Sequence, residues 1–147
     1  MVTVFGSHTQ PLIRYELDDS LRLLPDRCPC GRPFKLIGDV QGRVHEVLVF
    51  PGMAGGTVKV HPIIFHNIMD TLPVRGWQVV QETDCLHLLL ADVRGTVNES
   101  ELVDVVRQAL KKQEAVVPPV AVQRVNAIPQ ASSGKTQLVK SKLPHIN

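Results

Sequence analysis

A glycine and a lysine stand side by side near the carboxyl end of the chain, in the segment SSGKT at residues 132–136. A P-loop would also need a glycine five residues before Gly134, where this chain has Pro129, and a helix that the short remaining tail can scarcely supply. A lysine on such a segment can instead neutralise charge while a carboxylate reacts with an α-phosphate. Lys135 is therefore the leading catalytic candidate, although most lysines are simply solvated.

Two cysteines, Cys28 and Cys30, flank a proline and precede Gly31. Closely spaced thiolates can share a zinc ion, but a structural zinc site needs four ligands and this pair supplies half of them. Cys85 or His8 could add a ligand, yet the spacing matches no two-plus-two zinc pattern. We therefore expect a tight turn with free thiols and no metal, which agrees with a reducing compartment.

Five histidines could titrate near neutral pH, but none adjoins a serine or cysteine in a recognisable nucleophile motif: His45, His61, His66, His87 and His145. We expect His66, on or beside the apolar face of a predicted helix, and His87, within a predicted strand, to be packing or surface residues. The sequence gives no support to hydrolase chemistry.

The elements that must position these residues follow from hydrophobic spacing. The first third contains short strand-like runs separated by proline, glycine and aspartate: VTVF, PLIRYEL, SLRLL and FKLIGDV. Two further strands, EVLVF and VKV, flank the glycine-rich loop PGMAGGT. We predict that the first third is β-rich.

The later part of the chain alternates between helical and strand patterns. Pro62 suits the first turn of a helix over residues 62–72, and Pro73 ends it. Asn98 and Glu101 form a plausible capping pair for a second helix. The full set of predicted elements after the first helix is a hairpin of 77–83 and 85–93, a helix over 99–113, a strand over 120–128 and a polar tail without regular structure.

From VKV onward the order is strand, helix, strand, strand, helix, strand, which is the ferredoxin-like βαββαβ arrangement. The fold class predicted is α+β, with a β-rich piece over residues 1–44 and a second domain over 45–147. A change in sequence texture near residue 45 sets this boundary.

Composition excludes some partners. Lys and Arg number 16 against 14 Asp and Glu, and aromatic residues make up 4% of the chain, so neither a strong basic field nor a stacking platform predicts nucleic-acid binding. The amino terminus shows no signal-peptide pattern and no membrane anchor. A cytoplasmic location is the resulting expectation.

Three segments together resemble the carboxy-terminal end of phenylacetate-CoA ligases, a branch of the adenylate-forming enzymes: QPLIRYELDDSLRLL, CPCGRPFKLIGDVQGRVHEVLVF and IPQASSGKTQLV. The resemblance covers nearly the whole chain. Its most specific part is the CxCGR turn followed by a GR pair and an apolar strand.

The resemblance implies a role for four residues. Asp19, with Asp18 as the fallback, would bind the ribose hydroxyls of AMP, and Arg43 would lie beside the nucleotide. His45 would be the hinge of a mobile lid over residues 45–147, although the family usually has aspartates where this chain has His45 and the next residue, Glu46. Lys135 would stabilise the adenylation transition state.

The implied activity is ATP-dependent activation of a carboxylic acid, with an aryl acid such as phenylacetate favoured, to an acyl-adenylate and then transfer to CoA. ATP with Mg²⁺, AMP and CoA would be the ligands of the intact enzyme, yet none of the three segments contains the family's phosphate loop. We therefore expect no tight nucleotide binding by this chain alone, and a large adenylation domain as partner in cis or trans. An exposed apolar patch on the β-rich piece could also cause self-association. The alternative function is a non-catalytic binding or interaction module derived from such a ligase.

Overall fold

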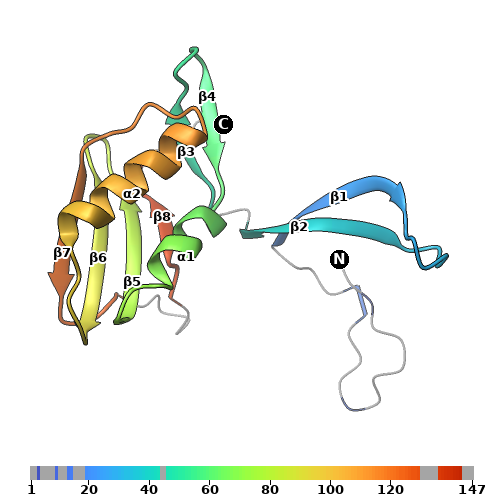
Figure 1. Cartoon of the computed structure of the whole chain (residues 1–147), viewed down its shortest axis with the longest axis horizontal. Helices are drawn as coiled ribbons and strands as arrows, with labels where there is room; N and C mark the ends of the chain where they lie inside the picture. Colours follow the sequence, from blue (N-terminus) through green and yellow to red (C-terminus); the bar gives the residue numbers. More distant parts are fainter. Residues whose placement is uncertain are drawn as a thin grey trace. The chain divides into compact units, whose positions relative to one another are not determined.

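The computed structural model describes residues 19–43, 46–129 and 136–143, together with the isolated positions 3, 9, 13 and 14 (Figure 1). The chain divides into two compact units, residues 1–44 and 45–147.

The first unit contains a β-hairpin. Strands β1 (Asp19–Arg27) and β2 (Lys35–Arg43) pair in antiparallel fashion, which confirms the strands predicted from SLRLL and FKLIGDV. The register shifts at several points, and such β-bulges add residues to one strand without a partner on the other. The runs VTVF and PLIRYEL fall mainly outside the described residues.

The second unit is built on two sheets and two helices. A two-stranded sheet joins β3 (Leu48–Pro51) to β4 (Thr57–Val60). The larger sheet has the order β7-β6-β5-β8, with β5 (Val74–Gln81) antiparallel to β6 (Leu86–Val93). Its outer strands, β7 (Val120–Val125) and β8 (Val139–Ser141), run parallel to β6 and β5 respectively.

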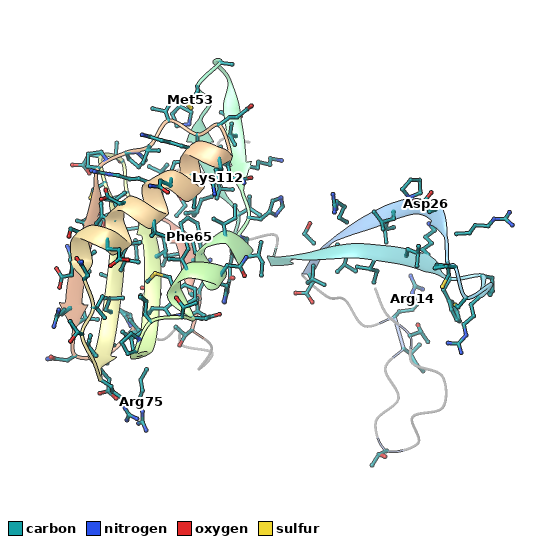
Figure 2. The ribbon with its side chains drawn as sticks, in the orientation of Figure 1. Arg14, Asp26, Met53, Phe65, Arg75 and Lys112 are labelled. Atoms are coloured by element: carbon teal, nitrogen blue, oxygen red, sulfur yellow. The ribbon has the colours of Figure 1, made fainter. Side chains whose placement is uncertain are left out.

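Both helices, α1 (Ile63–Met69) and α2 (Glu99–Lys112), lie on the same face of the four-stranded sheet (Figure 1). Alternate residues of β6, namely Leu86, Leu88 and Leu90, are fully buried beneath them. The helices contribute the other half of this core, including Phe65, which is labelled in Figure 2, together with Met69, Leu102, Val106 and Leu110. The period-2 and helical patterns read from the sequence therefore face each other in one hydrophobic core.

The helix boundaries follow local chemistry. In α2, the side chain of Asn98 accepts a hydrogen bond from the Glu101 backbone N–H at 3.3 Å, which confirms Asn98 as the N-cap. Helix α1 is shorter than the predicted 62–72 because residues after Asp70 turn towards Pro73. Strand β5 starts earlier than predicted, at Val74.

The α+β class is confirmed, and the order of elements from β4 to β7 is the predicted one. The pairing differs at one edge, since β4 pairs with β3 and β8 takes the place beside β5. The glycine-rich loop brings β3 and β4 together at low loop-closure cost, and β4 is thereby used in a local hairpin.

Strand β8 corrects the prediction that the whole tail lacks regular structure. Val139 is fully buried and pairs with Val79, and the backbone N–H of Val79 donates to the Leu138 carbonyl at 2.7 Å. A three-residue strand whose partner lies sixty positions away leaves no local periodicity to detect. Within the described part of the chain, no helix is long and apolar enough to span a membrane.

Candidate functional site

Two of the residues singled out by the sequence lie on opposite strands at the open end of the hairpin. Asp19 is the first residue of β1 and Arg43 the last of β2, and the two are direct partners in the antiparallel register. The Asp19 side chain is exposed. A carboxylate accepts hydrogen bonds from hydroxyls, and a guanidinium donates to hydroxyl or phosphate oxygens.

The register shifts of the hairpin decide this pairing. Leu24 is opposite Leu36, and a regular ladder extended five residues from that pair would set Asp19 opposite Gln41. Shifts between Arg22 and Leu23 and between Ser20 and Leu21 together move the partner of Asp19 to Arg43. Bulges re-aim strands next to functional sites in many proteins, and here they bring together two residues that the sequence alone left unpaired.

Lys135, His45 and the fallback Asp18 lie outside the described residues. The positions on either side of Lys135 are nevertheless anchored to β5. The Gln78 side-chain amide donates to the Gln137 carbonyl at 2.7 Å. On the other side, the Ile128 side chain lies against Gly76. A Cβ atom added to Gly76 would be 3.1 Å from Cγ1 of Ile128. Ile128 and Gln137 therefore both contact the same strand.

The cysteine pair forms the predicted turn. The Gly31 backbone N–H donates to the Cys28 carbonyl at 3.0 Å, and Gly31 has a φ of 77°, which glycine adopts without strain. The Sγ atoms of Cys28 and Cys30 lie 2.6 Å apart. Hydrogen bonds from the Cys28 thiol and from the Arg32 backbone hold the pKa of the Cys30 thiol below its ordinary value.

A polar cluster on the four-stranded sheet was not foreseen from the sequence. The Lys142 ammonium donates to Glu82 Oε1 at 2.7 Å, and His87 Nε2 lies 3.6 Å from Glu82 Oε2. The other nitrogen of His87 lies 3.0 Å from the side-chain nitrogen of Gln123. The hydrogen bond from Lys142 is the main reason that the pKa of Glu82 is lowered. Only the strand pairings bring these residues together, since they come from four separate segments.

His66 is a packing residue, in agreement with its position on the predicted helix. Its ring contacts Trp77 edge to face with centroids 4.8 Å apart, and its Nδ1 lies 3.1 Å from Asp70 Oδ2. The Trp77 indole donates to Asp70 Oδ1 at 2.8 Å. This network ties α1 to β5.

The hairpin also carries many exposed apolar side chains. Leu21 lies opposite Val40 and Leu23 opposite Ile37, and each of these four side chains is between 43% and 55% exposed. Figure 2 shows side chains projecting from both faces of the hairpin. An apolar surface of this kind is typical of a contact face.

Neither a protein-family model nor a curated protein sequence matches this chain. Among the residues that the structure describes, no group of three or more His, Cys, Asp or Glu side chains is placed to hold a metal ion.

Proposed function

We propose that the chain is the carboxy-terminal part of an ATP-dependent acid-CoA ligase of the phenylacetate-CoA ligase type, which works with a large adenylation domain in cis or trans. The observation that carries this proposal is the pairing of Asp19 with Arg43 at the end of the hairpin. The family resemblance assigns both residues to the nucleotide, and their positions opposite each other in the register support shared binding of one ligand.

In the proposed reaction, the substrate carboxylate attacks the α-phosphorus of ATP, the bond to the β-phosphate breaks, and pyrophosphate leaves. Asp19 accepts hydrogen bonds from the ribose hydroxyls, and Arg43 donates to the nucleotide. Lys135 neutralises the charge that develops between the carboxylate and the α-phosphate. The thiol of CoA then attacks the acyl-adenylate and AMP departs. Mg²⁺ would accompany ATP, and the described residues offer no cluster to hold it.

Residues 45–147 would be the mobile ferredoxin-like lid, with His45 as the hinge. The division of the chain between residues 44 and 45 supports this assignment, because a hinge must lie between two separately packed units. Lys135 would close over the site for adenylation and withdraw for CoA. The adenylation half has the stronger support, since the loop after β3 is longer than the family's usual loop near the thioester-forming face.

The hairpin would contact the large domain. A two-stranded sheet is marginal by itself, and its exposed Leu21, Leu23, Ile37 and Val40 need an apolar partner to become buried. A large adenylation domain would supply that surface. When it is absent, self-association of the hairpin is the expected consequence.

ATP–pyrophosphate exchange tests the proposal, with a panel of aryl and aliphatic acids and with the chain alone or mixed with a candidate large domain. We expect exchange only in the mixture, and its loss in Lys135→Ala. Lys140→Ala is the matched control, because it removes a lysine from the same tail and should retain exchange. Exchange that survives Lys135→Ala would contradict the assigned role.

The second candidate function is a non-catalytic interaction module descended from such a ligase. The exposed apolar hairpin favours it as well, because a module would bury the same surface against a different partner. No exchange with any acid, in the presence of a large domain that binds the chain, would support the module and overturn the ligase.

A further inference from the structure

The turn at the tip of the hairpin brings two thiols together before any oxidation. Cys28 and Gly31 are the first and last residues of a turn closed by the 3.0 Å backbone hydrogen bond, with Pro29 at the second position. Proline is favoured there because its fixed φ matches the turn. The reduced chain therefore holds Cys28 and Cys30 close together at little further entropic cost.

The distance between the sulfurs distinguishes two uses of such a pair. Two thiolates that share a tetrahedral zinc ion, each about 2.3 Å from the metal, would lie about 3.8 Å apart. The Sγ atoms here are 2.6 Å apart, in direct contact and closer together than two zinc ligands would be. The geometry favours bonding between the sulfurs over chelation.

The surroundings of the pair favour reaction with an anion. Three cationic residues, Arg27, Arg32 and Lys35, line one hollow at the hairpin tip together with Cys28, against one acidic residue, Asp26. Cys30 adjoins this hollow in the chain, since the next residue, Gly31, also lines it. Cys30 is exposed and Cys28 partly so. The lowered pKa of Cys30 increases its thiolate fraction, and the thiolate is the form that attacks disulfides.

We propose that Cys28 and Cys30 are a redox-active dithiol, oxidised reversibly to an intramolecular disulfide by a small anionic disulfide of the glutathione type. The Cys30 thiolate attacks one sulfur of the oxidant and expels one glutathione thiolate, which leaves a mixed disulfide. The Cys28 thiolate then attacks the Cys30 sulfur and expels the second glutathione. The protein pair loses two electrons and two protons, and the oxidant is reduced to two thiols. This inference does not depend on the proposed ligase function.

Peptide mass spectrometry of the full chain tests the proposal directly. Trypsin cleaves after Arg27 and Lys35 and leaves the Arg32–Pro33 bond intact, so residues 28–35 form one peptide that contains both thiols. Cys85 is released in a separate peptide, residues 76–94, and is the internal control. The reduced protein is treated with glutathione disulfide, alkylated and digested. We expect the 28–35 peptide to be two hydrogens lighter than its reduced form and to carry no alkyl group. Cys85 should still be alkylated. Excess reduced glutathione should restore the reduced, alkylatable 28–35 peptide.

Single-thiol variants separate the two steps. Cys28→Ser should accumulate a stable glutathione adduct on Cys30, because the resolving thiol is absent. Cys30→Ser should react more slowly, because it removes the thiol whose pKa is lowered. The proposal would be overturned by wild-type protein that accumulates the adduct without closing the ring. It would also be overturned by a 28–35 peptide that stays as open to alkylation as Cys85, or by a zinc ion already bound to the reduced pair in stoichiometric amount.

Discussion

At the scale of single residues, the end of the hairpin offers the sharpest test of nucleotide binding. Asp19 and Asp26 are exposed carboxylates on the same strand, at opposite ends of β1. Only Asp19 is paired with Arg43. The two aspartates are therefore a matched pair for distinguishing a specific contact from a general effect of negative charge.

We predict that Asp19→Asn weakens AMP binding by about tenfold or more in the assembled protein, because hydrogen bonds to a charged acceptor are the stronger kind. Asp26→Asn should leave the affinity unchanged. Isothermal titration with AMP, in the presence of the large domain, measures both. Equal effects of the two substitutions would show that Asp19 has no special role.

The Trp77 indole gives a second test at this scale. Trp77 is 6% exposed, and its N–H donates to Asp70. We predict that Asp70→Ala destabilises the second unit by about 1 kcal/mol, because the indole N–H loses its acceptor. Asp70→Asn retains an acceptor oxygen and should be affected less. Urea unfolding, followed by the fluorescence of this single tryptophan, measures the stability of each variant. If both variants lose the same free energy of unfolding, the effect comes from the charge of Asp70 and not from the hydrogen-bond acceptor.

At the scale of elements, β8 depends on contacts made far from it in the sequence. Its pairing with β5 is three residues long, and the backbone N–H of Lys142 extends it by donating to the Gln81 carbonyl at 2.8 Å. The ion pair of Lys142 with Glu82 fixes the same end of the strand.

This ion pair predicts a pH dependence with a definite sign. The folded-state pKa of Glu82 is lowered, so its contribution to stability is present above the ordinary glutamate pKa of about 4.3 and is lost as pH falls through the lowered value. Lys142→Met should therefore slightly reduce the free energy of unfolding at neutral pH and make no difference in stronger acid. Thermal unfolding from neutral to acid pH measures this. Lys140→Met leaves the Glu82 ion pair intact and should have the same stability as the wild type at each pH. If Lys142→Met is still less stable than the wild type in acid, the lost contact is not ionic.

At the scale of the whole molecule, the hydrophobic core belongs to one unit. Among the residues that the structure describes, every member of the core cluster lies between Leu48 and Val139, whereas the described part of the first unit exposes much of its apolar surface. The two units therefore have different sources of stability.

We predict that residues 45–147 alone keep a cooperative unfolding transition within about 1 kcal/mol of that in the full chain, because all the described residues of the core cluster belong to this unit. Residues 1–44 alone should show no cooperative transition, since two strands without a packed face are marginal. Circular dichroism of both pieces, with Trp77 fluorescence for the larger one, tests this. A large loss of stability in 45–147 would mean that the hairpin supports the core.

Local sequence patterns were enough to predict the elements that depend on residues close to one another in the chain. The alternation in CLHLLLADV, the stripe on residues 102–110 and the Asn98 cap each depend on neighbours in sequence, and each is present in the structure. The same is true of the turn at Cys28, since proline and glycine at their positions restrict the backbone directly. Lys135 and His45 lie outside the described residues, so the roles that the family resemblance implies for them stay predictions.

The amino-acid sequence by itself determined the α+β class, the order of the helices and strands, and the residue types available for chemistry, because each depends on local periodicity and backbone preference. Tertiary structure alone decided that β8 rather than β4 completes the sheet, that His87, Glu82 and Lys142 form one cluster, and that Asp19 lies opposite Arg43. These outcomes depend on pairing between distant segments, where a register shift of one or two residues changes every partner. Such shifts leave no mark in the local pattern.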